Sequence, residues 1–316
     1  MLANEGRLFR ANRLGGDDVG ARWLEARRHG VGGSDVAPIM GLSPWTSPLE
    51  VWLEKTGAVP AKDISHKEAV AMGTELEDTV FDMYRRRHPG RRAMRVNAIL
   101  TSIERPWAQA SLDGATIDPE LGWGVLEIKT GSRESEWADG VPDHYLTQVT
   151  HYMAVTGWRF ADVAALVGDH GLHYHEHRVL WDDGDVEVVT RAVDDFWLGY
   201  VMTGTMPALV TPLASEGRAV YAMHPEGDGE IADGDPDEVD GLARRMSEAS
   251  SRIKELQDER TECSNALKRL IGTHRGVNGG AWQATWSRTE RRDSGVRVRE
   301  VSHLTPRGGG LEALAD

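Results

Sequence analysis

Cysteine, lysine and long apolar runs are all scarce in this chain of 316 residues. Its one cysteine, Cys263, excludes an internal disulfide bond and is typical of a protein that works in a reducing compartment. No run of about 18 apolar residues occurs, and the first residues lack the apolar region of a secretion signal. We therefore expect a cytoplasmic chain that is neither secreted nor membrane-spanning.

Positive charge is also in deficit, because 36 Lys and Arg stand against 50 Asp and Glu, for a net charge of −14. The average field of such a protein repels phosphate, which excludes nucleic-acid coating through bulk charge and leaves only local or cation-assisted contact. Only six of the basic residues are lysines, and between residues 68 and 253 the only one is Lys129. A lysine kept where the chain otherwise uses arginine indicates a task for a compact ammonium or an amine that can lose its proton.

From about residue 17 to 212 the chain alternates helical and strand patterns, as a mixed α/β domain does. After the glycine-rich GVGGSD, Ser34 is a plausible N-cap of a short helix that ends near Gly41. Turn signals and apolar periodicity predict further helices at 17–29, 47–57, 74–88, 142–157 and 185–203, and strands at 95–103, 107–117, 123–130, 161–168 and 172–181.

The C-terminal third differs in composition. Residues 213–240, which include the acidic HPEGDGEIADGDPDEVD, are predicted to be a Gly- and Pro-containing linker. After it, apolar residues follow an alternating 4-3 spacing interrupted by Arg260, which predicts a helix on the order of 50 Å long. That helix either packs on its own chain or forms an intermolecular coiled coil.

A strand after the long helix places Trp282, Ala284 and Trp286 on one face, for core packing or for stacking of DNA bases. The predicted division is a first domain at 1–212, the linker at 213–240, a helical and β-hairpin extension at 241–302, and a flexible tail at 303–316.

The stretch SLDGATIDPELGWGVLEIKTGS carries the strongest chemical pattern. Glu127 and Lys129 lie two residues apart on a strand, so both point to the same side, and an antiparallel return places Asp113 near Glu127. Two adjacent carboxylates repel each other unless a proton or cation neutralises them, and Mg²⁺ prefers such oxygen ligands. The pattern predicts metal-assisted phosphodiester hydrolysis in which Lys129 orients or deprotonates the attacking water. A surface hairpin with a salt bridge carries the same residues and remains open on this stretch alone.

Two further segments bear on that site. Gln148 and Tyr152 lie four residues apart on a predicted helix, so both side chains can face it. Glu77 has two interpretations, a catalytic role or a helix-capping box with Thr74.

The loop RRHGVGGSD indicates phosphate binding. Its glycines allow close backbone approach, and Ser34 follows at a helix N-terminus, which together make an anion-binding nest. Arg27 can add a bidentate phosphate contact. The loop is not a P-loop, because no Gly-Lys-Ser/Thr follows.

Histidines offer a competing metal site. The last three of His170, His173, His175 and His177 alternate along one strand face, which by itself fits zinc or nickel.

Taken together, the motifs resemble those of a known family. WLEARRHGVGGSD, GTELEDTVFDMY, SLDG, LEIKTGS and YLTQVTHYMAVTG occur in the order and spacing of phage exonucleases of the lambda-exonuclease-like (YqaJ-type) branch of the PD-(D/E)XK nucleases. The resemblance covers about residues 17–205, and the joint set is specific where each piece is not. Leu112 departs from the motif's nominal proline, at a position that binds no metal. In this family the strand that begins GLHY lies away from the metals, which weakens the histidine alternative.

The resemblance implies an α/β (α+β) fold, with a PD-(D/E)XK restriction-endonuclease-like core whose mixed central sheet is flanked by helices. The long helix and β-hairpin extension lie outside it. It implies a Mg²⁺-dependent 5′-to-3′ exonuclease on double-stranded DNA ends, with two metals and Mn²⁺ as a substitute. The implied ligands are Asp113, Glu127 and the carbonyl of Ile128. Lys129 and Gln148 then serve the attacking water, Glu77 lies near the metals, and Tyr152 supports the site.

The resemblance also implies a site for the terminal 5′-phosphate, formed by Arg27, Ser34 and Ser111. It implies a homo-oligomeric ring, a trimer, working in the cytoplasm of a bacterial host with a single-strand annealing protein in phage-type recombination. Two alternatives stay open: another PD-(D/E)XK nuclease, either an endonuclease or a single-strand exonuclease, and a non-catalytic DNA-end-binding accessory.

Overall fold

The computed structural model describes residues 8–12, 19–59, 68–168, 171–208, 211–224, 226, 229–287 and 295–300. The chain divides into two compact units, Met1–Gly227 and Asp228–Asp316. None of the helices within those ranges is both long and apolar enough to cross a membrane.

A five-stranded mixed sheet forms the centre of the first unit, in the order β2-β5-β6-β7-β8. Its strands are β2 (Arg92–Arg95), β5 (Gly114–Asp118), β6 (Gly122–Gly131), β7 (Phe160–Val167) and β8 (His173–Leu180). Strand β6 runs parallel to β7, and the other neighbours are antiparallel. The predicted mixed central sheet is confirmed.

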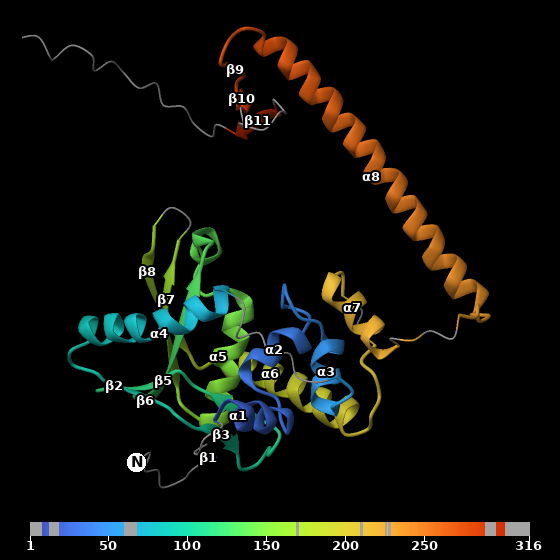
Figure 1. Ribbon diagram of the computed structural model, residues 1–316. Helices are drawn as coiled ribbons and strands as arrows, with labels where there is room; N and C mark the ends of the chain where they lie inside the picture. The colour runs from blue at the N-terminus through green and yellow to red at the C-terminus, as the bar shows by residue number, and fades with distance from the viewer. Residues whose placement is uncertain are drawn as a thin grey trace, which may run out of the picture. The chain divides into compact units, whose positions relative to one another are not determined.

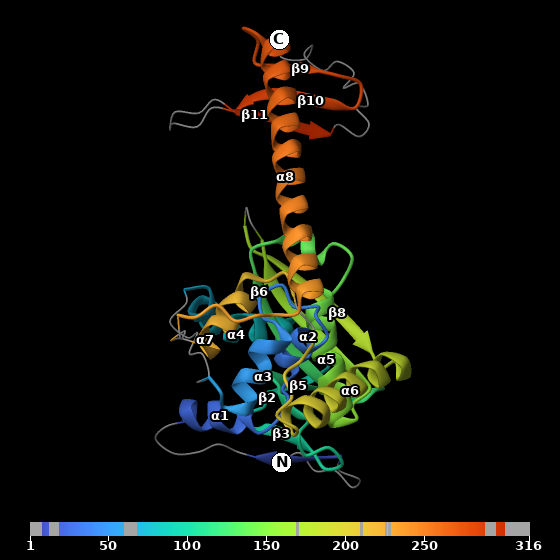
Figure 2. The ribbon, with the colours of Figure 1, turned by 90° about the vertical axis from the view of Figure 1, so that its right-hand side faces the viewer.

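Helices α4 (Glu68–Arg87) and α5 (Asp143–Thr156) cover opposite faces of this sheet (Figures 1 and 2). Leu126 and Ile128 of β6 pack with Tyr84 of α4, whereas Val125 packs with Val149 of α5. Because side chains alternate along a strand, Glu127 and Lys129 lie on the α5 side while Ile128 enters the core.

The predicted strands 95–103 and 107–117 are each broken in two. Strand β1 (Phe9–Asn12) pairs with β3 (Ile99–Ser102), which pairs with β4 (Gln109–Ser111), to form a separate three-stranded sheet. The chain leaves this sheet at Leu112 and joins the central sheet at Gly114. Asp113 therefore lies at the junction of two sheets and not within a continuous strand, because its neighbours on either side pair with different partners.

The remaining elements of the first unit are helical. They are α1 (Val19–Arg28), α2 (Gly33–Ile39), α3 (Pro48–Thr56), η1 (Glu134–Trp137), α6 (Asp183–Phe196), its continuation η2 (Trp197–Val201) and α7 (Ala214–Met223). Left-handed glycines end two helices as predicted: Gly57 closes α3 and Gly157 closes α5. Helix α7 lies inside the segment predicted as a linker, and the division between the two units, after Gly227, falls within that same segment.

Two predicted helix starts are wrong. Helix α4 begins at Glu68, so Thr74 and Glu77 lie within it and the capping-box interpretation fails. The N-cap of α2 is Gly32, and Ser34 sits in the first turn instead. The Asp35 carboxylate accepts the Gly32 N–H at 2.9 Å, which satisfies the helix start in place of a serine cap.

The second unit contains one long helix and a small sheet (Figure 2). Helix α8 (Pro236–Ile271) is followed by β9 (Gly276–Asn278), β10 (Trp282–Ser287) and β11 (Gly295–Glu300), in the order β11-β10-β9. The predicted hairpin is thus a three-stranded sheet. Ala284 is buried, whereas Trp282 is 49% exposed, so core packing does not hold for that tryptophan. The predicted tail at 303–316 and His170 lie outside the described residues.

Candidate active site

One open cleft collects every residue predicted to act in chemistry or phosphate binding. Its volume is about 410 Å³, which is within the range of small-molecule sites. Its walls come from α1, α2, α4, α5, β6 and the junction around Asp113. The predicted residues that line it are Arg27, Ser34, Glu77, Ser111, Asp113, Glu127, Ile128, Lys129, Gln148 and Tyr152.

Asp113 and Glu127 lie side by side, as the strand pattern predicted. Gly114 pairs with Leu126 across β5 and β6, which places the preceding aspartate opposite Glu127. The Ile128 N–H donates to Asp113 Oδ2 at 2.7 Å, and Lys129 Nζ donates to Glu127 Oε1 at 2.6 Å. Glu127 is 2% exposed, whereas Asp113 and Lys129 are half-buried, so the carboxylates and the ammonium meet at the floor of the open cleft.

Helix α5 supplies the second layer of the site. Gln148 Nε2 lies 2.7 Å from Glu127 Oε1 and 3.0 Å from the Tyr152 hydroxyl. The structure thus brings Gln148 to Glu127, and it brings Tyr152 to Gln148. Tyr145, which the sequence did not single out, places its ring 4.7 Å from Lys129 Nζ, a cation–π contact that fixes the ammonium from a third side.

Glu77 reaches the cleft from α4, but its carboxylate pairs with Arg95 of β2. Arg95 also pairs with Asp78 and donates to the Asp113 carbonyl at 3.4 Å. No local signal in the sequence marks Arg95, because its partners lie on a helix seventeen or more residues earlier and on a junction eighteen residues later.

The carboxylates of this site hold their protons unusually tightly. Burial, and then repulsion by Asp113, raise the pKa of Glu127 to about 8. Burial likewise raises the pKa of Asp113 and of Glu77. Burial would lower the pKa of Lys129, but the adjacent Glu127 and Asp113 outweigh it and raise it. If Asp113 and Glu127 were both ionised, they would carry more negative charge than the Lys129 ammonium balances, and a bound cation would offset the excess.

The residues present fit a bound divalent cation. Glu127 Oε2 is buried and has no hydrogen-bond partner within the described part of the chain. With the Asp113 carboxylate and the Ile128 carbonyl it makes an all-oxygen donor set, which suits Mg²⁺ retaining several waters. Across the ranges that the structure describes, no group of three or more His, Cys, Asp or Glu is arranged to hold a metal. A cation here would therefore depend on water and substrate oxygens for its remaining ligands.

The predicted phosphate-binding residues form one cluster on the wall of the cleft. Arg27 Nη2 donates to Ser34 Oγ at 2.7 Å and to Asp35 Oδ1 at 3.3 Å. Trp23 stacks under the Arg27 guanidinium at 4.6 Å and donates its indole N–H to Ser111 Oγ at 3.3 Å. Trp23 thus contacts Ser111 directly and Ser34 indirectly, because Arg27 lies between Trp23 and Ser34. The sequence pattern did not indicate this role of Trp23.

Two buried groups stand behind this cluster. Lys55 Nζ lies 2.7 Å from Asp35 Oδ2 and donates to the Arg27 carbonyl at 2.9 Å, and its side chain is wholly buried. Gly33 is required by close approach, because a Cβ at this position would collide with the Tyr152 ring. The α2 loop, α3 and α5 are therefore packed together directly behind Arg27.

The histidine cluster is an aromatic packing feature. His175 and His177 of β8 lie with ring centroids 6.3 and 6.2 Å from that of Trp137. As the histidines placed by the structure belong to no metal-holding group, the zinc or nickel alternative gains no support.

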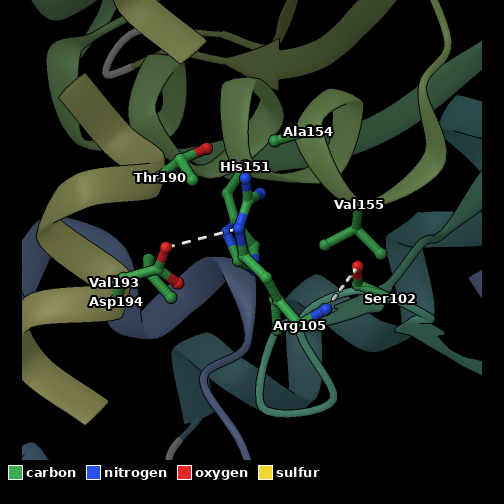
Figure 3. A pocket seen from close by; sticks show the side chains of 9 residues that line it. Ser102, Arg105, His151, Ala154, Val155, Thr190, Val193 and Asp194 are labelled. Atoms are coloured by element: carbon green, nitrogen blue, oxygen red, sulfur yellow. Dashed lines mark hydrogen bonds and ion pairs between the residues drawn. The ribbon is translucent and has the colours of Figure 1, made fainter. Parts of the chain in front are cut away.

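Figure 3 shows a second cavity, between α5 and α6 and lined by His151, Arg105 and Asp194. Its volume of about 10 Å³ is at the lower limit for one water molecule, so it is not a ligand site. His151 is buried, and its ring nitrogen lies 2.9 Å from the Gln109 carbonyl, which gives it a structural role.

The raised pKa of Glu127 makes the stability of the metal-free protein depend on pH. Between the ordinary value of 4.5 and the folded value of about 8, the unfolded chain releases a proton that the folded chain keeps, so stability falls as pH rises. Glu127→Gln has no such proton, and we expect a flatter decline. Calorimetric melting in chelator from about pH 5 to about pH 9 measures both slopes. Equal slopes would contradict the assigned burial of this carboxylate. Mg²⁺ should raise Tm of the wild type more than that of the variant.

The part of the chain that contains the cleft is similar to known proteins. Residues 22–159 match the model of the YqaJ-like viral recombinase domain. The chain is 37% identical over 199 residues to the uncharacterized protein YqaJ of Bacillus subtilis (strain 168), over 61% of this chain and 60% of that protein. It therefore spans about 60% of the length of this relative.

Solved structures show weaker similarity. An alkaline exonuclease from Laribacter hongkongensis is 23% identical, with a TM-score of 0.47 over 58% of this chain and 94% of that one. A phage-related exonuclease from Haemophilus somnus 129PT is 11% identical, with a TM-score of 0.38 over 56% and 95%. The family match spans the cleft from Trp23 to Tyr152, so the segment that forms the cleft, residues 22–159, is similar to the YqaJ-like viral recombinase domain.

Proposed function

We propose that this protein is a Mg²⁺-dependent 5′-to-3′ exonuclease that degrades double-stranded DNA from its ends and leaves 3′ single-stranded tails for phage-type recombination. The observation that carries the proposal is the buried Asp113, Glu127 and Lys129 cluster, which shares a cleft with the Arg27, Ser34 and Ser111 cluster. The first suits hydrolysis of a phosphodiester, and the second suits capture of a phosphate.

A divalent cation held by Asp113, Glu127 and the Ile128 carbonyl would lower the pKa of a bound water and screen the charge that develops on the phosphate. Lys129, fixed by Glu127 and the ring of Tyr145, orients the attacking water or takes its proton. Gln148 holds Glu127 in place from α5 and offers its amide to the same water.

The direction in which the DNA strand is degraded depends on which phosphate group binds at Arg27 and which one binds at Asp113. Ser34 and Asp35 already orient the guanidinium of Arg27. A terminal 5′-phosphate carries more negative charge than an internal phosphodiester, so it suits an oriented guanidinium of this kind. A 5′-terminal phosphate at Arg27 places the next phosphodiester bonds of the same strand toward Asp113. Repeated cleavage from that end runs 5′ to 3′.

Assembly and partners are part of the proposal. The protein forms a homo-oligomeric ring, a trimer, in this proposal. A ring encloses DNA, so an acidic chain would not need a positive net charge to hold it. The match to a viral recombinase model supports a role in recombination. In this proposal the protein works beside a single-strand annealing protein, in the cytoplasm of a bacterial host. Mn²⁺ substitutes for Mg²⁺ in this proposal. Glu77 would bind a second metal ion once its ion pair with Arg95 is broken.

Linear duplex labelled at either its 5′ or its 3′ end, incubated with Mg²⁺, Mn²⁺ or chelator, tests the activity. We expect early release of the 5′ label as mononucleotide, late loss of the 3′ label, and no reaction in chelator. Early release of the 3′ label would overturn the polarity. Cleavage of closed circular duplex would favour an endonuclease, degradation of single strands alone a single-strand exonuclease, and end binding without hydrolysis the accessory alternative.

Arg27→Gln is expected to remove the preference for 5′-phosphorylated ends, because the substitution deletes the charge that pairs with the terminal phosphate. Loss of a charge-assisted hydrogen bond of this kind corresponds to roughly tenfold to hundredfold in kcat/KM. The measurement compares kcat/KM on duplexes with 5′-phosphate and 5′-hydroxyl ends. Arg85→Gln, at an exposed arginine of α4, is the matched control. An unchanged ratio in Arg27→Gln would show that the phosphate binds elsewhere.

A further inference from the structure

Helix α8 presents an apolar stripe that is exposed over most of its length, with Leu267 half-buried near the end that contacts β9–β11. The helix has 36 residues and so measures about 54 Å. Met246 and Leu270 on the stripe are 74% and 68% exposed. We call the following set the α8 stripe: Val239, Leu242, Met246, Ala249, Ile253, Leu256, Arg260, Cys263, Leu267 and Leu270. A lone helix with this much exposed apolar surface lacks the packing that normally stabilises helices in water.

The spacing of the α8 stripe indicates what covers it. The spacing of its members alternates between three and four residues, which makes five heptads whose a and d positions are apolar except for Arg260. A period of 3.5 residues is the narrow seam of a coiled coil, whereas a helix that packs on a globular surface shows a wider face with a period of 3.6. The stripe therefore fits a second helix of the same kind.

A parallel, in-register pair is disfavoured by two features. It would place Arg260 in the core directly against Arg260 of the partner subunit, which buries two like charges. It would also bring the flanking g residues Arg252 and Glu259 beside the uncharged e residues Gln257 and Ser264, so no ion pair would compensate.

An antiparallel pair removes both defects. In the register that overlaps the full stripe, each a residue faces a d residue of the partner subunit. The two residue numbers of every facing pair add up to the same total. Arg260 then faces Ala249 of the partner subunit, whose small side chain leaves room for the arginine stem. Arg252 and Glu259 become neighbours across the seam, twice by symmetry, and Ile253 with Leu256 forms the central apolar layer.

We propose that α8 pairs with α8 of a second copy of this chain as an antiparallel two-stranded coiled coil. The residues that flank the seam then carry two symmetric Arg252–Glu259 ion pairs between subunits. The exposed stripe is the surface that this pairing buries. The link between copies is independent of the nuclease cleft, since every residue it uses belongs to the unit Asp228–Asp316.

The single natural cysteine allows a direct test of the register. In the antiparallel pair Cys263 faces Met246 of the partner subunit, while the two copies of Cys263 lie about 25 Å apart along the axis. We expect that Met246→Cys, in the full chain, gives a disulfide-linked dimer on mild oxidation and that the wild type does not. An intrachain bond cannot form, since the two positions are also about 25 Å apart along one helix.

Ser251→Cys is the matched control, because this position lies on the outer face of the helix, away from the seam. It should remain uncrosslinked. Crosslinking of the wild type through Cys263 alone would overturn the proposal in favour of a parallel arrangement. Absence of a dimer in Met246→Cys would also overturn it, in favour of a helix that packs on its own chain.

A second measurement does not depend on thiol chemistry. Ile253→Asp with Leu256→Asp places four charges in the central layer and should reduce the mass in solution by at least twofold, as measured by light scattering. The helical signal in circular dichroism should fall together with the mass, because the separated helix loses the packing that stabilises it in water. Ser251→Asp should leave the mass unchanged. An unchanged mass in the double variant would contradict the pairing.

Discussion

Lys129→Met is expected to lower kcat for phosphodiester hydrolysis by about 10²- to 10⁴-fold, the usual contribution of a positioned proton-transfer group. Methionine keeps the length of the side chain but removes the ammonium that lies 2.6 Å from Glu127 Oε1. Without it the attacking water loses its orienting donor, and two buried carboxylates lose their one compensating charge. Substrate binding should change little, since the Arg27 cluster lies elsewhere in the cleft.

Single-turnover hydrolysis of 5′-phosphorylated duplex at saturating enzyme measures this effect apart from binding. Lys129→Arg keeps the positive charge but cannot readily lose a proton, so it separates two roles. If the amine acts on the water, arginine should restore little activity, and if charge alone suffices, arginine should restore much of it. Wild-type rates in Lys129→Met would overturn the proposed mechanism.

Lys55→Met is expected to destabilise the first unit by about 3–5 kcal/mol, because the substitution leaves a buried carboxylate without its principal partner. The Lys55 side chain is wholly buried, and its ammonium lies 2.7 Å from Asp35 Oδ2. Lys55, followed by Arg27, holds the pKa of Asp35 below its ordinary value in spite of burial. The same carboxylate orients Arg27, so the phosphate cluster should loosen as well.

Urea unfolding curves of the wild type and the variant give the difference in free energy of unfolding. Lys254→Met, at an exposed lysine of α8, is the control and should stay within about 0.5 kcal/mol. Because a depressed carboxyl pKa stabilises only above that pKa, the loss should shrink as pH falls through the titration of Asp35. The double variant Asp35→Asn with Lys55→Met should lose less than the sum of the two single changes. Additive losses would show that the pair is not coupled.

Local chemistry accounts for the parts of the fold that the sequence predicted well. Gly57 and Gly157 end their helices in the left-handed conformation, which glycine adopts without steric cost. The strand of Glu127 and Lys129 is equally local, because a period of two residues fixes which side chains share a face. The caps of α2 and α4 were mistaken because Ser34 and Thr74 resemble cap residues, while Gly32 and a start at Glu68 leave weaker signals.

The break at Asp113 could not be predicted from the sequence. Residues 107–117 read as one strand, since each half has the composition of a strand. Only the pairing of β4 with β3 and of β5 with β6 divides it, and these partners are set by which apolar faces meet in the core. The division matters for the site, because it turns Asp113 out at a junction where its carboxylate accepts the Ile128 N–H.

Spacing within single elements was enough to predict the common face of Glu127 and Lys129, the common face of Gln148 and Tyr152, and the heptads of α8. Only the tertiary structure decided that Arg95 pairs with Glu77, that Trp23 joins Arg27 to Ser111, and that Lys55 is buried against Asp35. Those contacts join residues from separate elements, up to 88 positions apart. No periodicity encodes them, because they arise when packing of the core brings distant elements together.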